Sequence, residues 1–214
     1  MQRIRVALGA LAASASFFAP PALADSGGTT VKFMVTRDGA PIGTNLIRIG
    51  RDGPNMTVEM VTHVKVGFAF LTFYKFDQTE TERWSDGKLL ALESVTDDNG
   101  TIRRARATAQ DGALLVQCNG KTNRTPASTI PFNLWNAALM DRSVALDPRN
   151  GGLEALKVND RGEENVIVQG HTRRAHHYEI TTSFPEDVWY DDSGQLVQVE
   201  MKAVDGSTIR YQLA

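Results

Sequence analysis

The sequence predicts an all-β protein: a strongly curved antiparallel meander sheet, or an open β-barrel, of about ten to twelve strands with one short helix. Glycine-containing turn pairs recur along the chain, and apolar and polar residues alternate between them. Asp, Asn and Gly accept the positive φ of tight hairpin turns, and a period of two is typical of half-buried strands. The pairs are Asp38-Gly39, Asp52-Gly53, Asp86-Gly87, Asn99-Gly100, Asp111-Gly112, Arg161-Gly162, Ser193-Gly194 and Asp205-Gly206.

The first 24 residues have the three parts of a secretory signal peptide. Arg3 and Arg5 are basic, residues 6–18 are apolar, and Ala22-Leu23-Ala24 is a small-x-small cleavage site. We therefore expect cleavage after Ala24, a periplasmic or secreted product, and a single all-β domain over residues 25–214. The apolar run is too short to cross a bilayer and no later run is longer, so no membrane span is expected.

The first strands of the predicted domain cover residues 31–36, 42–49 and 56–66, where the alternation is clear. Residues 68–76 differ because they are apolar on both faces. A strand of that kind must be covered on both sides, or lie at an interface or a ligand cavity.

The same strand continues to residue 84, and Glu80, Glu82 and Trp84 share the face of Phe76. Two carboxylates are therefore expected on the aromatic side of the sheet. Paired carboxylates can serve as a general acid and base, although an ion pair with a cross-strand arginine is the more common arrangement. The arginines that could supply such a partner are Arg103, Arg104, Arg106, Arg173 and Arg174.

The alternation predicts a three-strand meander at residues 88–97, 101–110 and 113–119. A polar loop is predicted at residues 119–128. Residues 132–140 are the one plausible helix, because Pro131 suits a first helical position and a short apolar stripe follows it. We expect this helix to plug a barrel end or to cover the sheet. Six more strands are predicted at residues 153–158, 165–169, 172–182, 188–191, 195–204 and 208–213.

Charge and histidine spacing exclude several functions. A formal net charge of −2 argues against nucleic acid as a partner. His171 and His177 share a strand face but lie roughly 20 Å apart along an extended strand, too far to bind one ion. His176 shares the face of Tyr178 and Ile180 and is expected to point inward. We predict no metal site and no cofactor.

No recognised catalytic motif occurs in the chain, so we predict no catalytic residue. The tryptophans lie beside turns or the short helix, where large aromatic side chains cap a barrel mouth or line a ligand site. The candidate ligand-binding residues are Phe68, Phe70, Tyr74, Glu82, Trp84, Trp135, Asn136, His176 and Trp189.

Several spaced strings occur together: Asp38-Gly39 with Gly43, Glu82-Arg83-Trp84-Ser85-Asp86-Gly87, Trp135-Asn136, Trp189-Tyr190-Asp191, and Asp205-Gly206 with Tyr211-x-Leu213. In this order they resemble a family of exported proteobacterial proteins known only as a domain of unknown function. The family carries E-x-W-x-D-G, Y-W-N and W-Y-D elements, and Leu134 departs from it where a tyrosine would precede Trp135. The resemblance implies a large curled antiparallel sheet, distantly similar to that of other periplasmic proteins of unknown function, and no established activity.

These observations predict an exported protein that binds an apolar or amphipathic molecule, such as a lipid, within its curved sheet. Two alternatives remain. The protein could be a structural or interaction subunit that contacts another envelope protein and holds no small ligand. It could also be a hydrolase that uses Glu80, Glu82 and His176.

Overall fold

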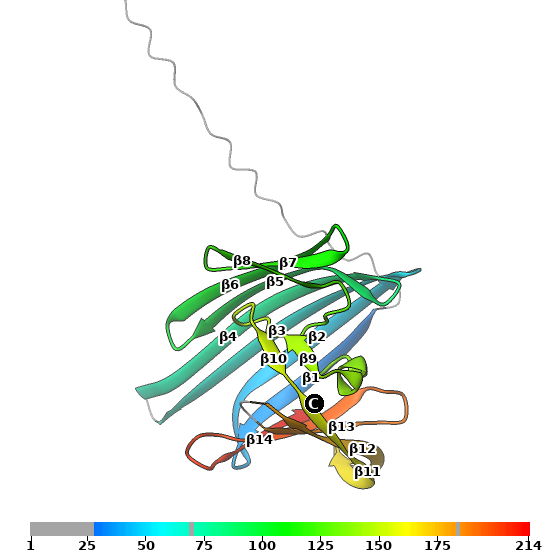
Figure 1. Cartoon of the computed structure of the whole chain (residues 1–214). Helices are drawn as coiled ribbons and strands as arrows, with labels where there is room; N and C mark the ends of the chain where they lie inside the picture. The colour runs from blue at the N-terminus through cyan, green and yellow to red at the C-terminus, as the bar shows by residue number, and fades with distance from the viewer. Residues whose placement is uncertain (1–27, 69–70, 183–184) are drawn as a thin grey trace, which may run out of the picture.

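In the computed structural model, which describes residues 28–68, 71–182 and 185–214, one antiparallel sheet of thirteen strands curves into an open wall (Figure 1). The strand order is β11-β12-β13-β14-β15-β1-β2-β3-β4-β5-β6-β7-β8. The last strand pairs with the first, so the two halves of the chain form one continuous sheet with free edges at β11 and β8. The predicted fold class is confirmed. The predicted signal peptide lies outside the described residues.

Strands of the large sheet that are consecutive in the chain are also neighbours in the sheet, except for β8 and β11, which residues 127–156 connect. That segment holds the 3₁₀ helix η1 (Ala137–Asp141) and a separate hairpin of β9 (Val144–Leu146) and β10 (Leu153–Ala155). The sheet strands are β1 (Thr29–Arg37), β2 (Ala40–Asp52), β3 (Asn55–Phe68), β4 (Leu71–Ser85), β5 (Lys88–Asp98), β6 (Thr101–Gln110), β7 (Ala113–Cys118), β8 (Lys121–Pro126), β11 (Lys157–Val168), β12 (His171–Thr181), β13 (Glu186–Tyr190), β14 (Leu196–Lys202) and β15 (Thr208–Leu213).

Two local predictions were wrong. The helix is a short 3₁₀ turn that begins at Ala137, because Asn136 has an extended backbone and its side chain caps the helix by accepting from the Ala138 amide at 3.1 Å. The expected loop at 119–128 contains the edge strand β8, whose polar residues pair with β7. Polar and basic residues are typical of an edge strand, because they discourage pairing with other chains.

The segment of residues 127–156, called here the crossing segment, lies over the concave face of the sheet (Figure 1). Its buried residues Ile130, Leu139 and Leu146 belong to the same apolar core as Phe33 and Leu92 of the sheet. The crossing segment thus covers the concave face of the sheet. This is one of the two positions predicted for the helix at residues 132–140. Burial of each such side chain contributes about 1.5–3 kcal/mol.

A close approach of two strands requires glycine at position 43 of β2. A Cβ built there would lie 2.0 Å from the carbonyl oxygen of His63 and 2.9 Å from the Cα of Val64. Both atoms belong to the backbone of β3, so Gly43→Ala must force the paired strands apart. We predict that Gly43→Ala lowers the free energy of unfolding by about 2–4 kcal/mol in urea denaturation.

The matched control is Gly28→Ala, because the nearest atom to a Cβ there is the Ile49 carbonyl oxygen at 3.4 Å. This variant should change the free energy of unfolding by less than about 0.5 kcal/mol. Equal losses in the two variants would contradict the close-approach argument.

Candidate functional site

Two carboxyl groups lie buried at the centre of the concave face. Glu80 and Glu82 point inward from β4 and are only 3% and 0% exposed. Trp84 follows on the same face and is also buried. The predicted orientation of the pair toward an aromatic side chain is confirmed. The pair thus lies where the sheet meets the crossing segment.

The crossing segment supplies most of the hydrogen bonds to these carboxyl groups. The side-chain amide of Asn133 donates to Oε1 of Glu80 at 2.7 Å and also to Oε1 of Glu82. Glu82 accepts from the indole nitrogen of Trp84 at 2.7 Å and from that of Trp135 at 3.4 Å. The two indole rings meet edge to face with their centroids 5.9 Å apart. Asn133 and Trp135 therefore fasten the crossing segment to β4.

The expected ion pair with arginine was wrong. Arg104 and Arg106 point to the outer face of the sheet, because the alternate residues Ala105 and Ala107 are the buried ones. Arg106 pairs with Glu93 there at 3.1 Å, and the half-buried Arg103 pairs with Asp98 at 3.9 Å. The last two candidates, Arg173 and Arg174, lie on β12, where Arg174 pairs with Glu163.

Burial governs the protonation of the glutamate pair. It raises the pKa of Glu80 well above its usual range, and the charge of Glu82 beside it raises that pKa further. Burial also raises the pKa of Glu82, but the N–H donors of Trp84 and Asn133 oppose the shift. These directions assign the shared proton to Glu80, with Glu82 as the carboxylate that accepts from it. One shared proton removes most of the repulsion between two buried carboxylates.

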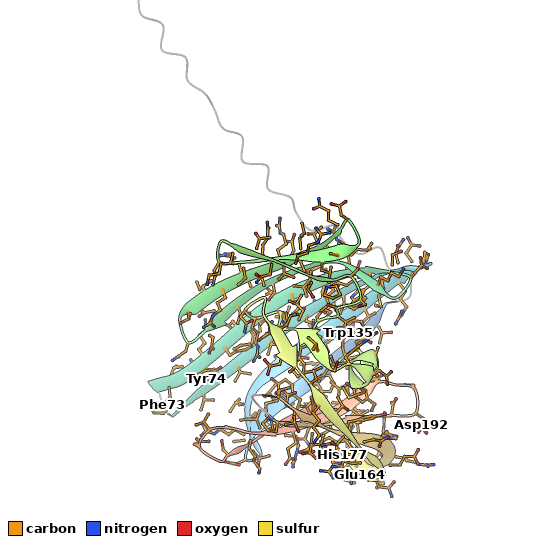
Figure 2. All side chains as sticks on the ribbon, in the orientation of Figure 1. Phe73, Tyr74, Trp135, Glu164, His177 and Asp192 are labelled. Atoms are coloured by element: carbon orange, nitrogen blue, oxygen red, sulfur yellow. The ribbon has the colours of Figure 1, made fainter. Side chains whose placement is uncertain are left out.

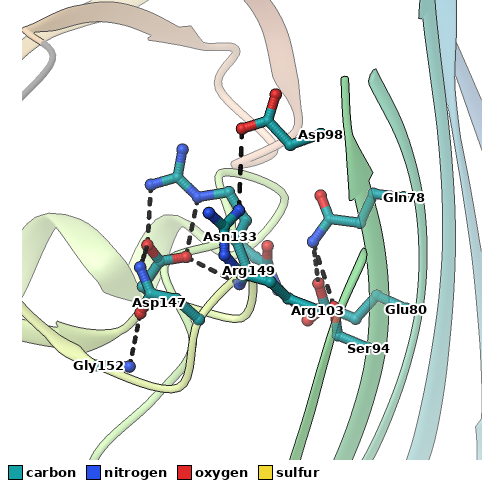
Figure 3. Close-up of polar contacts among 10 residues, drawn as sticks. Gln78, Glu80, Ser94, Asp98, Arg103, Asn133, Asp147, Arg149 and Gly152 are labelled. Atoms are coloured by element: carbon teal, nitrogen blue, oxygen red, sulfur yellow. Dashed lines mark hydrogen bonds and ion pairs between the residues drawn. The ribbon is translucent and has the colours of Figure 1, made fainter. Parts of the chain in front are cut away.

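Further polar groups extend from this pair along the interior (Figure 3). The amide of Gln78 donates to Oε2 of Glu80 at 3.3 Å and to Ser94 at 3.4 Å. On the crossing segment the buried Asp147 accepts from Nε of Arg149 at 2.9 Å. The sequence analysis assigned no role to Asn133, Asp147 and Arg149. The residues around a polar side chain do not indicate which distant strand that side chain will contact.

A groove of about 440 Å³ opens beside the crossing segment. Its floor is apolar and comes from β1 and β2, whereas its rim contains the turn between β13 and β14. Trp135 joins the groove to the glutamate pair, since it lines the groove and also donates to Glu82. The lining residues are Thr29, Val31, Phe33, Ile47, Ile49, Arg51, Trp135, Asn136, Ala137, Ala138, Ser193, Gly194, Gln195 and Leu196.

A larger hollow of about 630 Å³ crosses β4 to β8. Most of its lining residues belong to the outer face, including Thr81, Arg104 and the ion-paired Glu93 and Arg106, but the inward-facing Glu80 and Ser94 also line it. We place the candidate site at the smaller groove, because an apolar floor with a few polar groups at the rim is typical of small-molecule sites.

The two-faced apolar stretch does not line this groove. Phe73 is 63% exposed and Tyr74 is 38% exposed toward the far end of the β3–β4 hairpin (Figure 2). Partial burial and a hydrogen bond to the Asp98 carboxylate raise the pKa of Tyr74 to about 12. Phe70 and the side chain of Phe68 lie outside the described residues.

His176 and Trp189 also lie apart from the glutamate pair. His176 bonds Asp160 at 2.6 Å and stacks on Tyr178 with their centroids 4.6 Å apart. Trp189 belongs to a second small apolar cluster and donates to Glu164. The structure thus brings together four of the predicted residues, Glu82, Trp84, Trp135 and Asn136, and gives His176 no bond to either glutamate within the described chain. No group of three His, Cys, Asp or Glu side chains in that part of the chain is placed to hold a metal.

The glutamate pair predicts an asymmetric response to amide substitution. Glu82→Gln turns an acceptor into an amide whose own N–H groups face the donors of Trp84 and Asn133, so we expect a loss of about 2–3 kcal/mol in the free energy of unfolding. Glu80→Gln keeps a donor toward Glu82 and should cost about 1 kcal/mol or less. Urea denaturation of both variants at neutral pH measures the difference, and equal losses would contradict the assigned protonation.

Comparison with known proteins agrees with this picture of the fold. The family model described as a domain of unknown function, DUF6134, matches residues 33–214. The crystal structure of a beta-barrel-like protein of domain of unknown function DUF1849 from Brucella abortus is similar, with a TM-score of 0.65, 12% identity, and coverage of 86% of this chain and 94% of that chain. At such identity the likeness shows the fold alone.

A search of curated proteins finds no match. Within the described residues, no helix has the length and apolar character needed to cross a membrane. The sequence elements with tryptophan predicted a family of unknown function, and the matched residues extend over most of the strands described above. The chain therefore belongs to the DUF6134 family, a domain of unknown function.

Proposed function

We propose that this protein is an exported binding protein that holds a small apolar or amphipathic molecule in the groove beside Trp135. The apolar floor of the groove, open along a polar rim, is the observation that carries the proposal. Its volume of about 440 Å³ falls in the range typical of small-molecule sites, about 300–1,000 Å³. The crossing segment fills much of the concave face, and the groove lies at one side of that segment.

The glutamate pair supports this function indirectly. Trp135 forms one wall of the groove, and its indole nitrogen is held by Glu82 at 3.4 Å. The Asn133 amide fixes the backbone just before Trp135. A wall that is ordered before binding lowers the entropy lost when a ligand enters. We assign the buried pair to positioning of the groove wall.

The signal-peptide features of residues 1–24 support export, and export would suit a binding role outside the cytoplasm. Such a compartment allows disulfides, but the chain has one cysteine, Cys118, and its stability rests on packing. The hydrolase alternative has less support, because the polar contacts of His176 go to Asp160, not to the glutamate pair.

Nile red, a neutral dye that fluoresces in apolar surroundings, tests the groove. Ile49 is half-buried on the groove floor, and Ile49→Asn places an amide there. We expect this variant to lower the affinity for Nile red by about tenfold, the equivalent of about 1.4 kcal/mol. Ile209→Asn is the matched control, because Ile209 is also half-buried on the sheet but does not line the groove. Absence of dye binding by the unmodified protein, or equal losses in both variants, would contradict the proposal.

The exposed end of the β3–β4 hairpin favours one second candidate, a subunit that docks through this hairpin on another envelope protein. Phe73 is 63% exposed there, and a large aromatic side chain in water is costly unless something covers it. If so, protein extracted from its own envelope should show a mass above that of one chain in light scattering, and Phe73→Ser should abolish the excess. Ile102→Ser is the control at a similar exposure of 58%. A single-chain mass for the unmodified protein would exclude this candidate.

A further inference from the structure

Among the described residues, one cation lines the groove, and no other described residue pairs with it. Arg51 alternates along β2 with Ile47 and Ile49, which places all three on the face that lines the groove. Arg51 is exposed, and its guanidinium forms no ion pair or hydrogen bond with the described part of the chain. A guanidinium offers a planar fork of N–H donors that matches carboxylate and phosphate groups.

The electrostatics of the groove are one-sided. Among the described residues that line it, Arg51 is the only charged side chain. The rim turn carries two carboxylates, Asp191 and Asp192, and neither lines the groove. Asp191 is occupied by the turn, since it accepts from the Ser193 hydroxyl at 2.6 Å and from the backbone N–H of Gln195 at 3.1 Å. The remaining rim is neutral and polar, with Thr29 and Asn136 as further groups able to donate hydrogen bonds.

We propose that the ligand of this groove is a single-chain amphiphile with an anionic head, a carboxylate or a phosphate, which Arg51 binds. The apolar chain lies along the floor formed by Ile49 and Ile47, against Trp135. A single chain fits because the volume of about 440 Å³ is toward the lower end of small-molecule sites. This inference rests on the proposed function and names the ligand class of the same groove.

The test compares four probes that share one apolar chain and differ in the head: dodecanoate, dodecyl phosphate, dodecanol and dodecylamine. Each displaces Nile red from the full chain, below the concentration at which the probe forms micelles. We expect one or both anionic probes to bind about tenfold more tightly than dodecanol, and dodecylamine to bind more weakly than dodecanol. The better of the two anionic probes identifies the head group as a carboxylate or a phosphate.

Two arginine variants locate the effect. Arg51→Gln should bring the affinity for the anionic probes down to that of dodecanol and leave dodecanol binding unchanged. Arg48→Gln is the matched control, because Arg48 is an exposed arginine of β2 on the opposite face, and it should keep the full preference. Circular dichroism checks that both variants keep the fold.

The possible outcomes separate the two proposals. If none of the four probes displaces the dye and the dye itself does not bind, the binding function fails, and this inference fails with it. If dodecanol binds as tightly as the anionic probes, or if the preference persists in Arg51→Gln, the groove binds ligand but the assignment to Arg51 and an anionic head is wrong.

Discussion

The hydrogen-bonded carboxyl groups of Glu80 and Glu82 are the interaction on which the arrangement of the interior depends. Removing a carboxylate from water is expensive, and two of them side by side would also repel each other. The structure meets this cost in two ways. Burial keeps a proton on Glu80, and the N–H groups of Trp84, Asn133 and Trp135 surround the remaining charge on Glu82. No cation is needed, because the donors are neutral dipoles fixed in place.

That pair determines where the crossing segment lies, and the crossing segment determines what remains open. Asn133 and Trp135 attach the segment to β4, while the hydroxyl of Tyr190 on β13 donates to the Leu134 carbonyl at 2.8 Å. The segment is therefore held from both halves of the sheet at nearly the same point. Because its wall is fixed there, the groove between η1 and the strands β1 and β2 keeps its shape, and the half-buried Ile49 is the exposed part of its apolar floor.

The sequence could predict the strands because turn chemistry and alternation are local signals. Asp86 and Asn99 adopt φ values of 48° and 52°, the left-handed conformation expected of such hairpin turns. The partners of Glu82 could not be predicted, because Asn133 lies 51 residues further along and nothing local records which distant strand it meets. Arginine seemed the natural partner by charge alone. Arg104 and Arg106 in fact point to the outer face, because they alternate along the strand with the buried residues Ala105 and Ala107. The alternation of small apolar and charged residues in the sequence already implied this orientation.

The sheet is open, with its free edges at β11 and β8. The crossing segment runs from the end of β8 to the start of β11 and occupies the concave side between them. An open edge invites pairing with other chains, and both edges carry features that oppose it. On β8 these are the exposed Lys121 and Arg124 and the terminal Pro126, which has no N–H to donate. On β11 a register shift after Asp160 bends the strand. The chain connection that holds the interior polar groups thus also links the two edge strands, and the groove lies between this connection and the open wall.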